Sequence, residues 1–298
     1  KQSMNGCAKK RFENYKQQPL EFVFDKSFTG KLSQFGLNPD RRTPSGIKAA
    51  IIREKGTNGE REMAYMLYLA GFDVKDVTMT DLVSGRETLE DINMVVYCGG
   101  FSNSDVLGSA KGWAGSFLFN PKAKAALDNF YAREDTLSLG VCNGCQLMME
   151  LGLITPEDEK KGKMLHNDSH KFESAFLGVT VPMNRSVMFG SLSGSKLGIW
   201  VAHGEGKFSL PYPEDHYNVV LKYSYDEYPG NPNGSDYSVA GIASQDGRHL
   251  AMMPHLERAC FPWENAYYPL DRKNEDQITP WMEAFVNARK WVEANRKK

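Results

Sequence analysis

TLSLGVCNGCQLMMELG, residues 136–152, changes from a strand pattern to a helix pattern and places Cys142 where the two meet. Residues 136–141 form a short apolar run of the kind that builds a buried strand, and residues 146–151 open a helix. A helix N-terminus favours the thiolate of a cysteine, which is its nucleophilic form. We expect Gly140 and Gly144 to permit a sharp turn and the close approach of a substrate. The stretch therefore predicts a cysteine at the end of a strand, in a position where a thiolate is favoured.

Apolar runs and helical patterns alternate on both sides of this stretch. Strand patterns occupy residues 47–53, 72–79 and 92–100, and helical patterns occupy residues 57–71 and 120–132. Residues 238–255 predict two strands joined by a turn at Asp246 and Gly247, and a last helix begins at Thr279 and Pro280. This alternation predicts a doubly wound α/β fold, with a mostly parallel sheet and helices on both faces.

Size and charge exclude several classes of protein. The chain has 298 residues, of which 41% are apolar, which supports one large or two modest domains with a real core. Its formal net charge of -1 argues against a general affinity for nucleic acid or for an anionic membrane. No apolar run approaches the length of a membrane span.

The first part of the chain differs from the rest. Residues 1–46 contain few sustained apolar periods, so we expect an N-terminal extension or linker that wraps a surface, followed by one domain over residues 47–298. The chain begins at Lys1 without an initiator Met, and we expect it to be a piece of a longer protein. Its first residues lack the apolar centre of a signal peptide. Five cysteines, an odd number, favour a reducing cytoplasm over a disulfide-stabilised secreted protein.

Cys142 and Cys145 also allow other interpretations. A zinc site needs a second pair of ligands; the chain has no second Cys-x-x-Cys, although His166 and His170 are spaced four apart. A thioredoxin-like redox pair also lies at a helix start, and two structural core cysteines fit the pattern as well. The stretch alone leaves the redox pair and the structural cysteines open, and we expect no metal.

MMPHLERA, residues 252–259, favours the nucleophile. A cysteine nucleophile needs a base, and the base needs a third group that fixes its tautomer. His255 and Glu257 lie two residues apart just after a predicted strand, where alternate side chains share a face. Together with Cys142 at another strand end, they predict a cysteine–histidine–glutamate site at one edge of the sheet.

These motifs resemble a known family. GVCNGCQ, residues 140–146, is similar to the Gly-x-Cys-x-Gly-x-Gln nucleophile motif of class I glutamine amidotransferases, which have a flavodoxin-like fold, and PHLE, residues 254–257, resembles their His-x-Glu. The chain resembles more closely the C-terminal glutaminase domain of phosphoribosylformylglycinamidine synthases of the large single-chain type. The stretches that carry this resemblance are PSGIKAAIIREKGTNGEREMA (44–64), GGFSNSDVLG (99–108), GWAGSFLFN (112–120), NDSHKFES (167–174), VAHGEGKF (201–208), YPGNPNGS (228–235) and DGRHLAMMPHLER (246–258). The resemblance covers nearly the whole chain, including the extension, which resembles the linker from the synthetase part.

The resemblance implies a role for each matching residue. Cys142 is expected to form a γ-glutamyl thioester, His255 to act as a general base and then to protonate the leaving ammonia, and Glu257 to orient His255. The backbone amides of Gly100 and Asn143 correspond to the oxyanion hole. The residues expected to hold the substrate are Gln146, Phe101, Asn184, Arg185, Ser186, His203 and Glu205.

The resemblance also implies the reaction and the partners. We expect hydrolysis of L-glutamine to glutamate and ammonia, with the ammonia used by a synthetase domain of the same longer polypeptide to make formylglycinamidine ribonucleotide. ATP and Mg²⁺ are expected in that synthetase part only, since this chain has no Gly-x-x-x-x-Gly-Lys-Ser/Thr segment and we expect no cofactor in it. A Cys-x-x-Cys redox protein and a non-catalytic binding module of the same fold are the alternatives.

Two departures from the family pattern lie near the site. Asn103 and Ser104 replace a Tyr-Gly pair in the loop after Gly100, and Leu256 replaces a proline between His255 and Glu257. The first is expected to alter the loop that covers glutamine or contacts the synthetase domain, and the second to loosen how His255 is presented.

Overall fold

A nine-stranded sheet forms the centre of the computed structural model, which describes residues 4–17 and 20–296. Its strand order is β3-β1-β4-β6-β13-β12-β11-β8-β9, and the first five of these strands run parallel to one another. Those five are β3 (Asp73–Thr78), β1 (Lys48–Arg53), β4 (Met94–Tyr97), β6 (Leu137–Val141) and β13 (His249–Met252). Every residue of β4 and β6 is buried, as expected for parallel strands covered on both faces.

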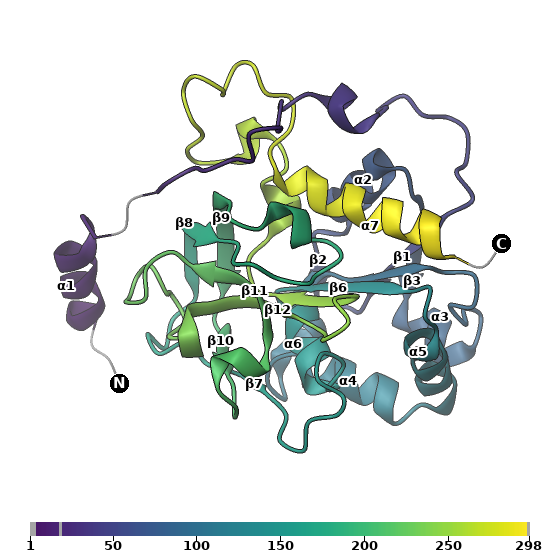
Figure 1. Cartoon of the computed structure of the whole chain (residues 1–298). Coiled ribbons are helices and arrows are strands. Elements are labelled where there is room, and N and C mark those ends of the chain that lie inside the picture. The colour runs from purple at the N-terminus through teal and green to yellow at the C-terminus, as the bar shows by residue number, and fades with distance from the viewer. Residues whose placement is uncertain (1–3, 18–19, 297–298) are drawn as a thin grey trace.

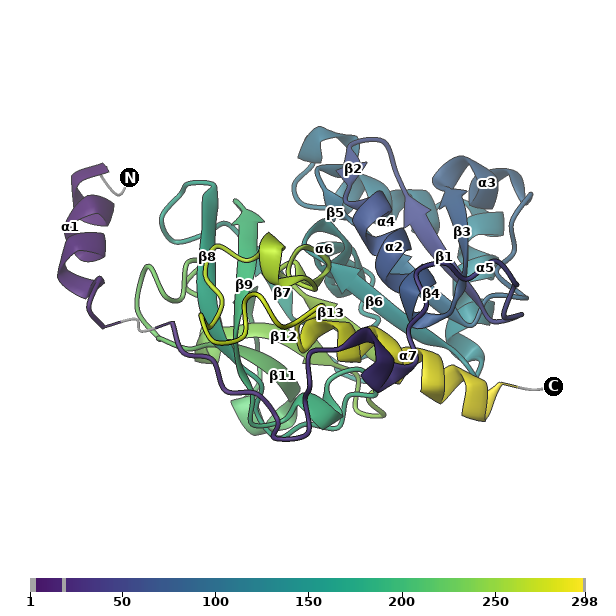
Figure 2. The ribbon, with the colours of Figure 1, turned by 90° about the horizontal axis from the view of Figure 1, so that it is seen from above.

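The other half of the sheet is antiparallel. It contains β12 (Val239–Ala243), β11 (Asn218–Tyr223), β8 (Glu173–Thr180) and β9 (Lys196–His203), and two small sheets pair β2 (Thr57–Asn58) with β5 (Gly99–Gly100) and β7 (Lys163–Leu165) with β10 (Lys207–Ser209). In Figures 1 and 2, β8 and β9 run across the direction of β6. This curl brings the edge strand β9 back to the parallel strands, where Trp200 forms a β-bridge with His255.

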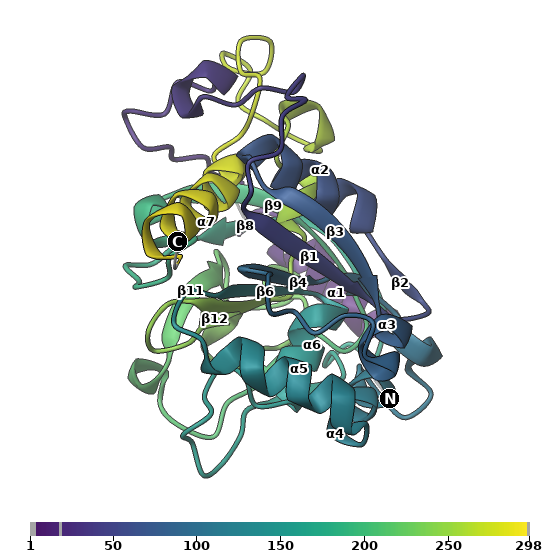
Figure 3. The same cartoon turned by 90° about the vertical axis from the view of Figure 1, so that its right-hand side faces the viewer.

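Helices cover both faces of the sheet, as Figure 3 shows. On one face α2 (Glu60–Ala70) packs against α7 (Trp281–Asn295); on the other lie α3 (Met79–Ser84), α4 (Lys111–Leu118), α5 (Pro121–Ala132) and α6 (Asn143–Glu150). Each long helix buries one apolar side; in α5 this side consists of Ala123, Ala126, Leu127 and Phe130. The predicted α/β fold class is confirmed, as are the predicted strands and helices of residues 47–141 and the β12–β13 strand pair. No helix of residues 4–17 and 20–296 is long and apolar enough to cross a membrane.

The N-terminal segment lies along the outside of this domain. Helix α1 (Met4–Asn14) lies beyond β8 in Figures 1 and 2, and Arg11 forms an ion pair of 2.6 Å with the buried Glu173. Residues 20–46 then pass towards α7, and Phe28 joins the hydrophobic core. Residues 1–3 and 18–19 of the expected extension lie outside the described residues. The boundary between residues 46 and 47 stays a prediction.

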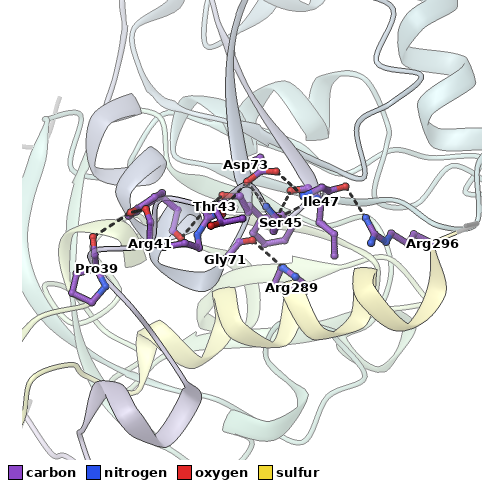
Figure 4. Close-up of polar contacts among 12 residues, drawn as sticks. Pro39, Arg41, Thr43, Ser45, Ile47, Gly71, Asp73, Arg289 and Arg296 are labelled. Atoms are coloured by element: carbon purple, nitrogen blue, oxygen red, sulfur yellow. Dashed lines mark hydrogen bonds and ion pairs between the residues drawn. The ribbon is translucent and has the colours of Figure 1, made fainter.

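Hydrogen bonds hold the end of the N-terminal segment to the start of β3 and to the end of α7, as Figure 4 shows. Arg41 donates to the carbonyl oxygen of Phe72 at 2.6 Å and to the carboxylate of Asp73 at 3.0 Å. Arg296, which follows α7, donates to the carbonyl oxygen of Gly46 at 2.6 Å. The segment just before β1 is therefore held by charged hydrogen bonds.

The turn between β6 and α6 depends on two glycines. Gly140 and Gly144 do not have positive φ; Cys142 has it instead. A Cβ on Gly144 would lie 2.0 Å from the carbonyl oxygen of Tyr97, and one on Gly140 would lie 2.5 Å from the carbonyl oxygen of Gly144. These glycines are needed because α6 packs directly on the backbone of β4 and β6.

The substitution Gly144→Ala tests this packing. Because the added methyl group meets a backbone atom that cannot turn away, we expect the free energy of unfolding to fall by about 3 kcal/mol. The measurement is chemical unfolding followed by circular dichroism. Gly190→Ala is the matched control, since the nearest atom to its added Cβ lies 3.9 Å away. Equal unfolding midpoints for the two variants would show that the close packing does not constrain residue 144.

Candidate active site

Cys142 lies between β6 and α6 in a strained backbone conformation. Its φ is 53° and its ψ is -108°, values that a non-glycine residue keeps only when its surroundings hold it. Its backbone N–H donates to the carbonyl oxygen of Met252, the last residue of β13, at 3.0 Å. The side chain is 5% exposed and borders a cavity. The structure thus places this thiol at the carboxyl end of the parallel strands, as the sequence predicts.

His255 and Glu257 lie beside this thiol. Nδ1 of His255 and Oε1 of Glu257 are 2.7 Å apart, and both side chains are buried. A Cβ on Gly99 would lie 2.9 Å from Cε1 of His255 and 3.3 Å from Cβ of Cys142, so the imidazole and the cysteine flank the same glycine. Nε2 of His255 has no hydrogen-bond partner among the described residues. Glu257 therefore fixes one nitrogen of the ring and leaves the other free.

These neighbours favour a thiolate and an imidazolium. Burial by itself would raise the pKa of the Cys142 thiol, but interactions with His203 and His255 outweigh burial and lower the pKa to about 5. Burial would likewise lower the pKa of His255, but the charge of Glu257 and the contact with Cys142 raise this pKa to about 9. Between these two values the thiol is ionised and the ring of His255 is protonated. Such a pair combines a strong nucleophile with a proton donor.

The thiol also contacts β9. Sγ of Cys142 lies 3.7 Å from the carbonyl oxygen of Ala202, to which the protonated thiol can donate, and His203 is the next residue along the strand. Strand β9 also positions His255, which lies after β13: the backbone N–H of His255 donates to the carbonyl oxygen of Trp200 in β9 at 2.9 Å. One strand therefore positions two histidines around a single cysteine.

A cavity of about 220 Å³ opens beside these groups. Its mouth is formed by Phe101 and Phe172, whose ring centroids are 6.0 Å apart. Burial raises the pKa of the Asp105 carboxyl, and the nearby Glu205 adds to this effect. The residues that line the cavity are Gly100, Phe101, Asp105, Cys142, Gln146, Phe172, Ala202, His203, Gly204 and Glu205. Its size and its two carboxylates suit a small polar molecule that carries a positive charge.

Hydrogen bonds join the walls of this cavity. Asn143 accepts from the backbone N–H of Ser102 at 3.0 Å and donates to Oε1 of Gln146 at 2.8 Å. Gln146 in turn donates to the carbonyl oxygen of Glu205 at 2.7 Å. The amide of Gln146 is therefore engaged with the protein itself, so its clearest structural role is to hold the wall. The backbone N–H of Asn143 lies in the first turn of α6, where amides have no acceptor within the helix.

The structure brings most of the predicted site residues together and leaves three of them elsewhere. Asn184, Arg185 and Ser186 do not line the cavity beside Cys142. Val187 donates to the carbonyl oxygen of Gly247, just before β13 begins, whereas Cys142 lies where β6 and β13 end. These three residues therefore lie at the opposite end of the strands, and we remove them from the proposed pocket. Asn184 instead bonds the backbone of its own loop, at 2.9 Å to the carbonyl oxygen of Pro182.

Sequence reasoning missed Asp105, Phe172 and Ala202. Asp105 and Phe172 fall inside the stretches GGFSNSDVLG and NDSHKFES, so the motifs contained a signal for them. The contact through the carbonyl oxygen of Ala202 had no such signal, because it depends on the curl of the sheet rather than on a side-chain type.

Cys145 differs from Cys142 in its surroundings. Its side chain is fully buried in α6, and burial raises the pKa of its thiol well above the ordinary value. The two cysteines form no disulfide. A buried thiol that resists ionisation is a poor partner in thiol–disulfide exchange, so this arrangement does not favour a redox pair.

Comparison with known proteins agrees with this geometry. The family model of the CobB/CobQ-like glutamine amidotransferase domain matches residues 46–292. The chain belongs to this family.

Individual relatives extend the comparison. The chain is 44% identical over 266 residues to the Arabidopsis thaliana protein named "Probable phosphoribosylformylglycinamidine synthase, chloroplastic/mitochondrial", covering 83% of this chain and 19% of that protein. It is 44% identical over 281 residues to the Homo sapiens phosphoribosylformylglycinamidine synthase, covering 84% of this chain and 21% of that one. The structure of PurLQS from Thermotoga maritima matches with a TM-score of 0.63 and 27% identity, over 83% of this chain and 99% of that chain. The amidotransferase chain thus spans about one fifth of the length of the curated relatives it matches.

The substitution Glu257→Gln tests the charge arrangement of this amidotransferase site. Without the carboxylate the imidazolium of His255 is less stable, so the thiolate that it faces is less stable too. We expect the midpoint of the pH dependence of Cys142 alkylation by iodoacetamide to rise by about one unit from its value near pH 5. Peptide mass spectrometry identifies the labelled cysteine.

Glu293→Gln is the control, because this carboxylate is exposed on α7 and pairs with Arg289 at 3.1 Å. It should leave the midpoint unchanged. If Cys142 in the unaltered protein titrates near the ordinary cysteine pKa of about 8.5, the thiolate–imidazolium pair is contradicted.

Proposed function

We propose that this chain is a glutaminase, which hydrolyses L-glutamine to glutamate and ammonia through a thioester on Cys142. The observation that carries the proposal is the buried group formed by Cys142, His255 and Glu257 at the rim of a small cavity. In this group a lowered thiol pKa faces a raised imidazole pKa. Membership of a glutamine amidotransferase family supports the same reaction.

The first half of the reaction forms the thioester. The thiolate of Cys142 attacks the side-chain amide carbon of glutamine, and the developing oxyanion accepts hydrogen bonds from the backbone amides of Gly100 and Asn143. One such donor typically contributes about 3 kcal/mol to the transition state. The imidazolium of His255 then gives its proton to the amide nitrogen, and ammonia leaves.

The second half releases glutamate. His255, now neutral, takes a proton from a water molecule, and the resulting hydroxide attacks the thioester carbon. The carbon–sulfur bond breaks, glutamate leaves, and the thiolate of Cys142 faces the imidazolium again. Glu257 holds the ring through Nδ1 in both halves, which keeps Nε2 directed towards the reacting atoms.

We assign the recognition of glutamine to the residues at the mouth of the cavity. The carboxylate of Asp105 supplies a negative charge for the α-ammonium group, while the carboxylate of Glu205 accepts from the backbone N–H of Ser109 at 3.1 Å and shapes the wall. Phe101 and Phe172 border the opening. The predicted roles of Phe101, His203 and Glu205 as pocket residues stay proposals, as does that of Gln146.

The wider role follows from the names of the relatives. Two relatives of about five times this length are named phosphoribosylformylglycinamidine synthases. We propose that the ammonia made here is used by a synthetase domain of the same longer polypeptide, which makes formylglycinamidine ribonucleotide in purine biosynthesis. The cytoplasm stays a prediction from cysteine usage, since the plant relative is named for the chloroplast and the mitochondrion.

Replacement of the nucleophile tests the reaction itself. We expect Cys142→Ala to lower ammonia release from glutamine by at least about 1,000-fold in the intact polypeptide, because no thioester can form. A glutamine-mimicking alkylating agent should label Cys142 alone. Cys145→Ala is the matched control and should retain ammonia release. Loss of function in Cys145→Ala with an active Cys142→Ala would favour the redox alternative, and bound glutamine without turnover in the unaltered polypeptide would favour a binding module.

The substitution Asp105→Asn tests glutamine recognition. Losing a charged hydrogen-bond partner costs about 1.5–3 kcal/mol, so we expect kcat/KM for glutamine to fall about 10- to 100-fold, mostly through KM. Steady-state ammonia release measures both constants. Asp128→Asn, on the exposed side of α5, should behave like the unaltered protein. An unchanged KM for glutamine in Asp105→Asn would show that Asp105 does not bind the α-ammonium group of glutamine.

A further inference from the structure

Helix α1 lies against the amidotransferase domain with one of its faces. Cys7, Arg11 and Asn14 follow one another at intervals of four and three residues, so their side chains share one side of the helix. Cys7 is buried, and Nδ2 of Asn14 donates to the carbonyl oxygen of Tyr228 at 2.7 Å. Arg11 lies between them on this face, with its side chain about half-exposed.

Arg11 joins two polar groups of the domain. Its Nη2 donates to Oε2 of Glu173 at 2.6 Å, and its Nε donates to the hydroxyl of Tyr228 at 2.9 Å. This hydroxyl donates in turn to Oε1 of Glu173 at 3.1 Å. Burial and the charge of Glu173 raise the pKa of Tyr228 to about 12, so the hydroxyl keeps its hydrogen. Arg11, Tyr228 and Glu173 therefore form a closed ring of three hydrogen bonds.

Glu173 needs the charge of Arg11 because its own carboxylate is buried. The side chain of Glu173 is 3% exposed, and within the part of the chain that the structure describes no other cation forms an ion pair with it. A buried charge that loses its partner is strongly unfavourable. Without Arg11, we expect the carboxylate of Glu173 to turn towards water and to displace the start of β8.

Glu173 begins β8 at the point where the sheet meets the cavity. In the β8–β9 ladder Glu173 pairs with His203, which lines the cavity. The residue before it, Phe172, also lines the cavity, and its ring lies 6.0 Å from that of Phe101 at the mouth. Because Phe172 and Glu173 share a peptide bond, a displacement of Glu173 moves the ring of Phe172.

Asn167 holds the other end of the segment that carries Phe172. Its Nδ2 donates to the carbonyl oxygen of Lys171 at 2.9 Å and to that of the last residue of β9 at 2.8 Å. Residues 168–172 therefore lie between two attachments, one at Asn167 and one at Glu173. The first attachment lies within the domain, whereas the second depends on a side chain of α1.

We propose that Arg11 is a positioning residue for glutamine binding, which holds Phe172 at the mouth of the cavity through its ion pair with Glu173. The proposal rests on the glutaminase function given above. Arg11 does not line the cavity, so it acts on glutamine through Phe172. The expected N-terminal extension then contributes to the substrate site and does more than wrap the surface of the domain.

The substitution Arg11→Met in the intact polypeptide tests this role, because it removes the charge and keeps much of the side-chain length. We expect KM for glutamine to rise about 10-fold, since a misplaced Phe172 weakens binding, and kcat to change by less than about twofold, since the reacting groups are untouched. Arg11→Lys keeps the charge but loses the bond from Nε to Tyr228, so KM should rise less. Steady-state ammonia release measures both constants.

Two double variants show whether Arg11 acts through Glu173 and Phe172. Glu173→Gln removes the buried charge, so adding Arg11→Met to it should raise KM far less than Arg11→Met does alone. Phe172→Ala removes the ring, so adding Arg11→Met to it should have no further effect on KM. Additive effects in either pair overturn the proposal.

Hydrogen exchange followed by mass spectrometry examines the same attachment in the absence of glutamine. In Arg11→Met the backbone amides of residues 168–173 should exchange at least about 10-fold faster, because the segment is held at one end only. The amides of α5 should exchange at an unchanged rate, since this helix lies on the other side of the domain from α1, as Figure 1 shows.

Lys9→Met is the matched control. Lys9 lies on the same helix and pairs at 3.6 Å with the exposed Glu13, and an exposed pair of this kind contributes little. This variant should leave KM, kcat and the exchange of residues 168–173 unchanged. Circular dichroism identifies variants that fail to fold, and Arg11→Lys takes the place of Arg11→Met if the latter does not fold. An unchanged KM or an unchanged exchange rate in the folded Arg11 variant overturns the proposal.

The two proposals can fail separately. Faster exchange of residues 168–173 in Arg11→Met, in a polypeptide that never releases ammonia, keeps the attachment of the mouth to α1 and rejects the glutaminase. Ammonia release with an unchanged KM in Arg11→Met keeps the glutaminase and rejects the positioning role of Arg11.

Discussion

The site exists because one edge strand returns to the carboxyl ends of the parallel strands. The hydrogen bond from the backbone N–H of His255 to the carbonyl oxygen of Trp200, 2.9 Å long, joins β9 to the loop that follows β13. A flat sheet in this strand order would keep β9 four strands away from β13. The curl of the antiparallel half removes that separation, and only then does Cys142 meet Ala202 and His203.

Burial makes each charge of this site unfavourable by itself and strengthens the attraction between opposite charges. Burial opposes the thiolate of Cys142 and the imidazolium of His255, yet the interactions between these groups and with Glu257 outweigh burial for both. This balance is sensitive, because a buried charge that loses its partner is strongly unfavourable. The contact through which Glu257 fixes the ring of His255 is consistent with that sensitivity.

The loop over the cavity contains a different kind of strain. Asn103, Ser104 and Asp105 all have positive φ, between 49° and 58°. Asn103 and Ser104 form one of the two departures that the sequence analysis expects from the family pattern, and they lie in a segment with unusual backbone geometry. Strained loops of this kind often occur where a substrate is bound. Here the strain places Asp105 at the cavity and leaves Phe101 exposed at its mouth.

The sequence by itself determined the α/β class, the strand before Cys142 and the helix after it, since these follow from local apolar periodicity. It also indicated His255 and Glu257, because their spacing after a strand is a local feature. Only the tertiary structure decided which distant loops share the cavity: it removed Asn184, Arg185 and Ser186, which lie at the other end of the strands, and added Asp105, Phe172 and Ala202. It likewise showed that Gly140 and Gly144 allow α6 to pack directly on the backbone of β4 and β6. The physical reason is that curling of the sheet and contacts between distant loops arise from many weak interactions across the whole chain, which no short stretch of residues records.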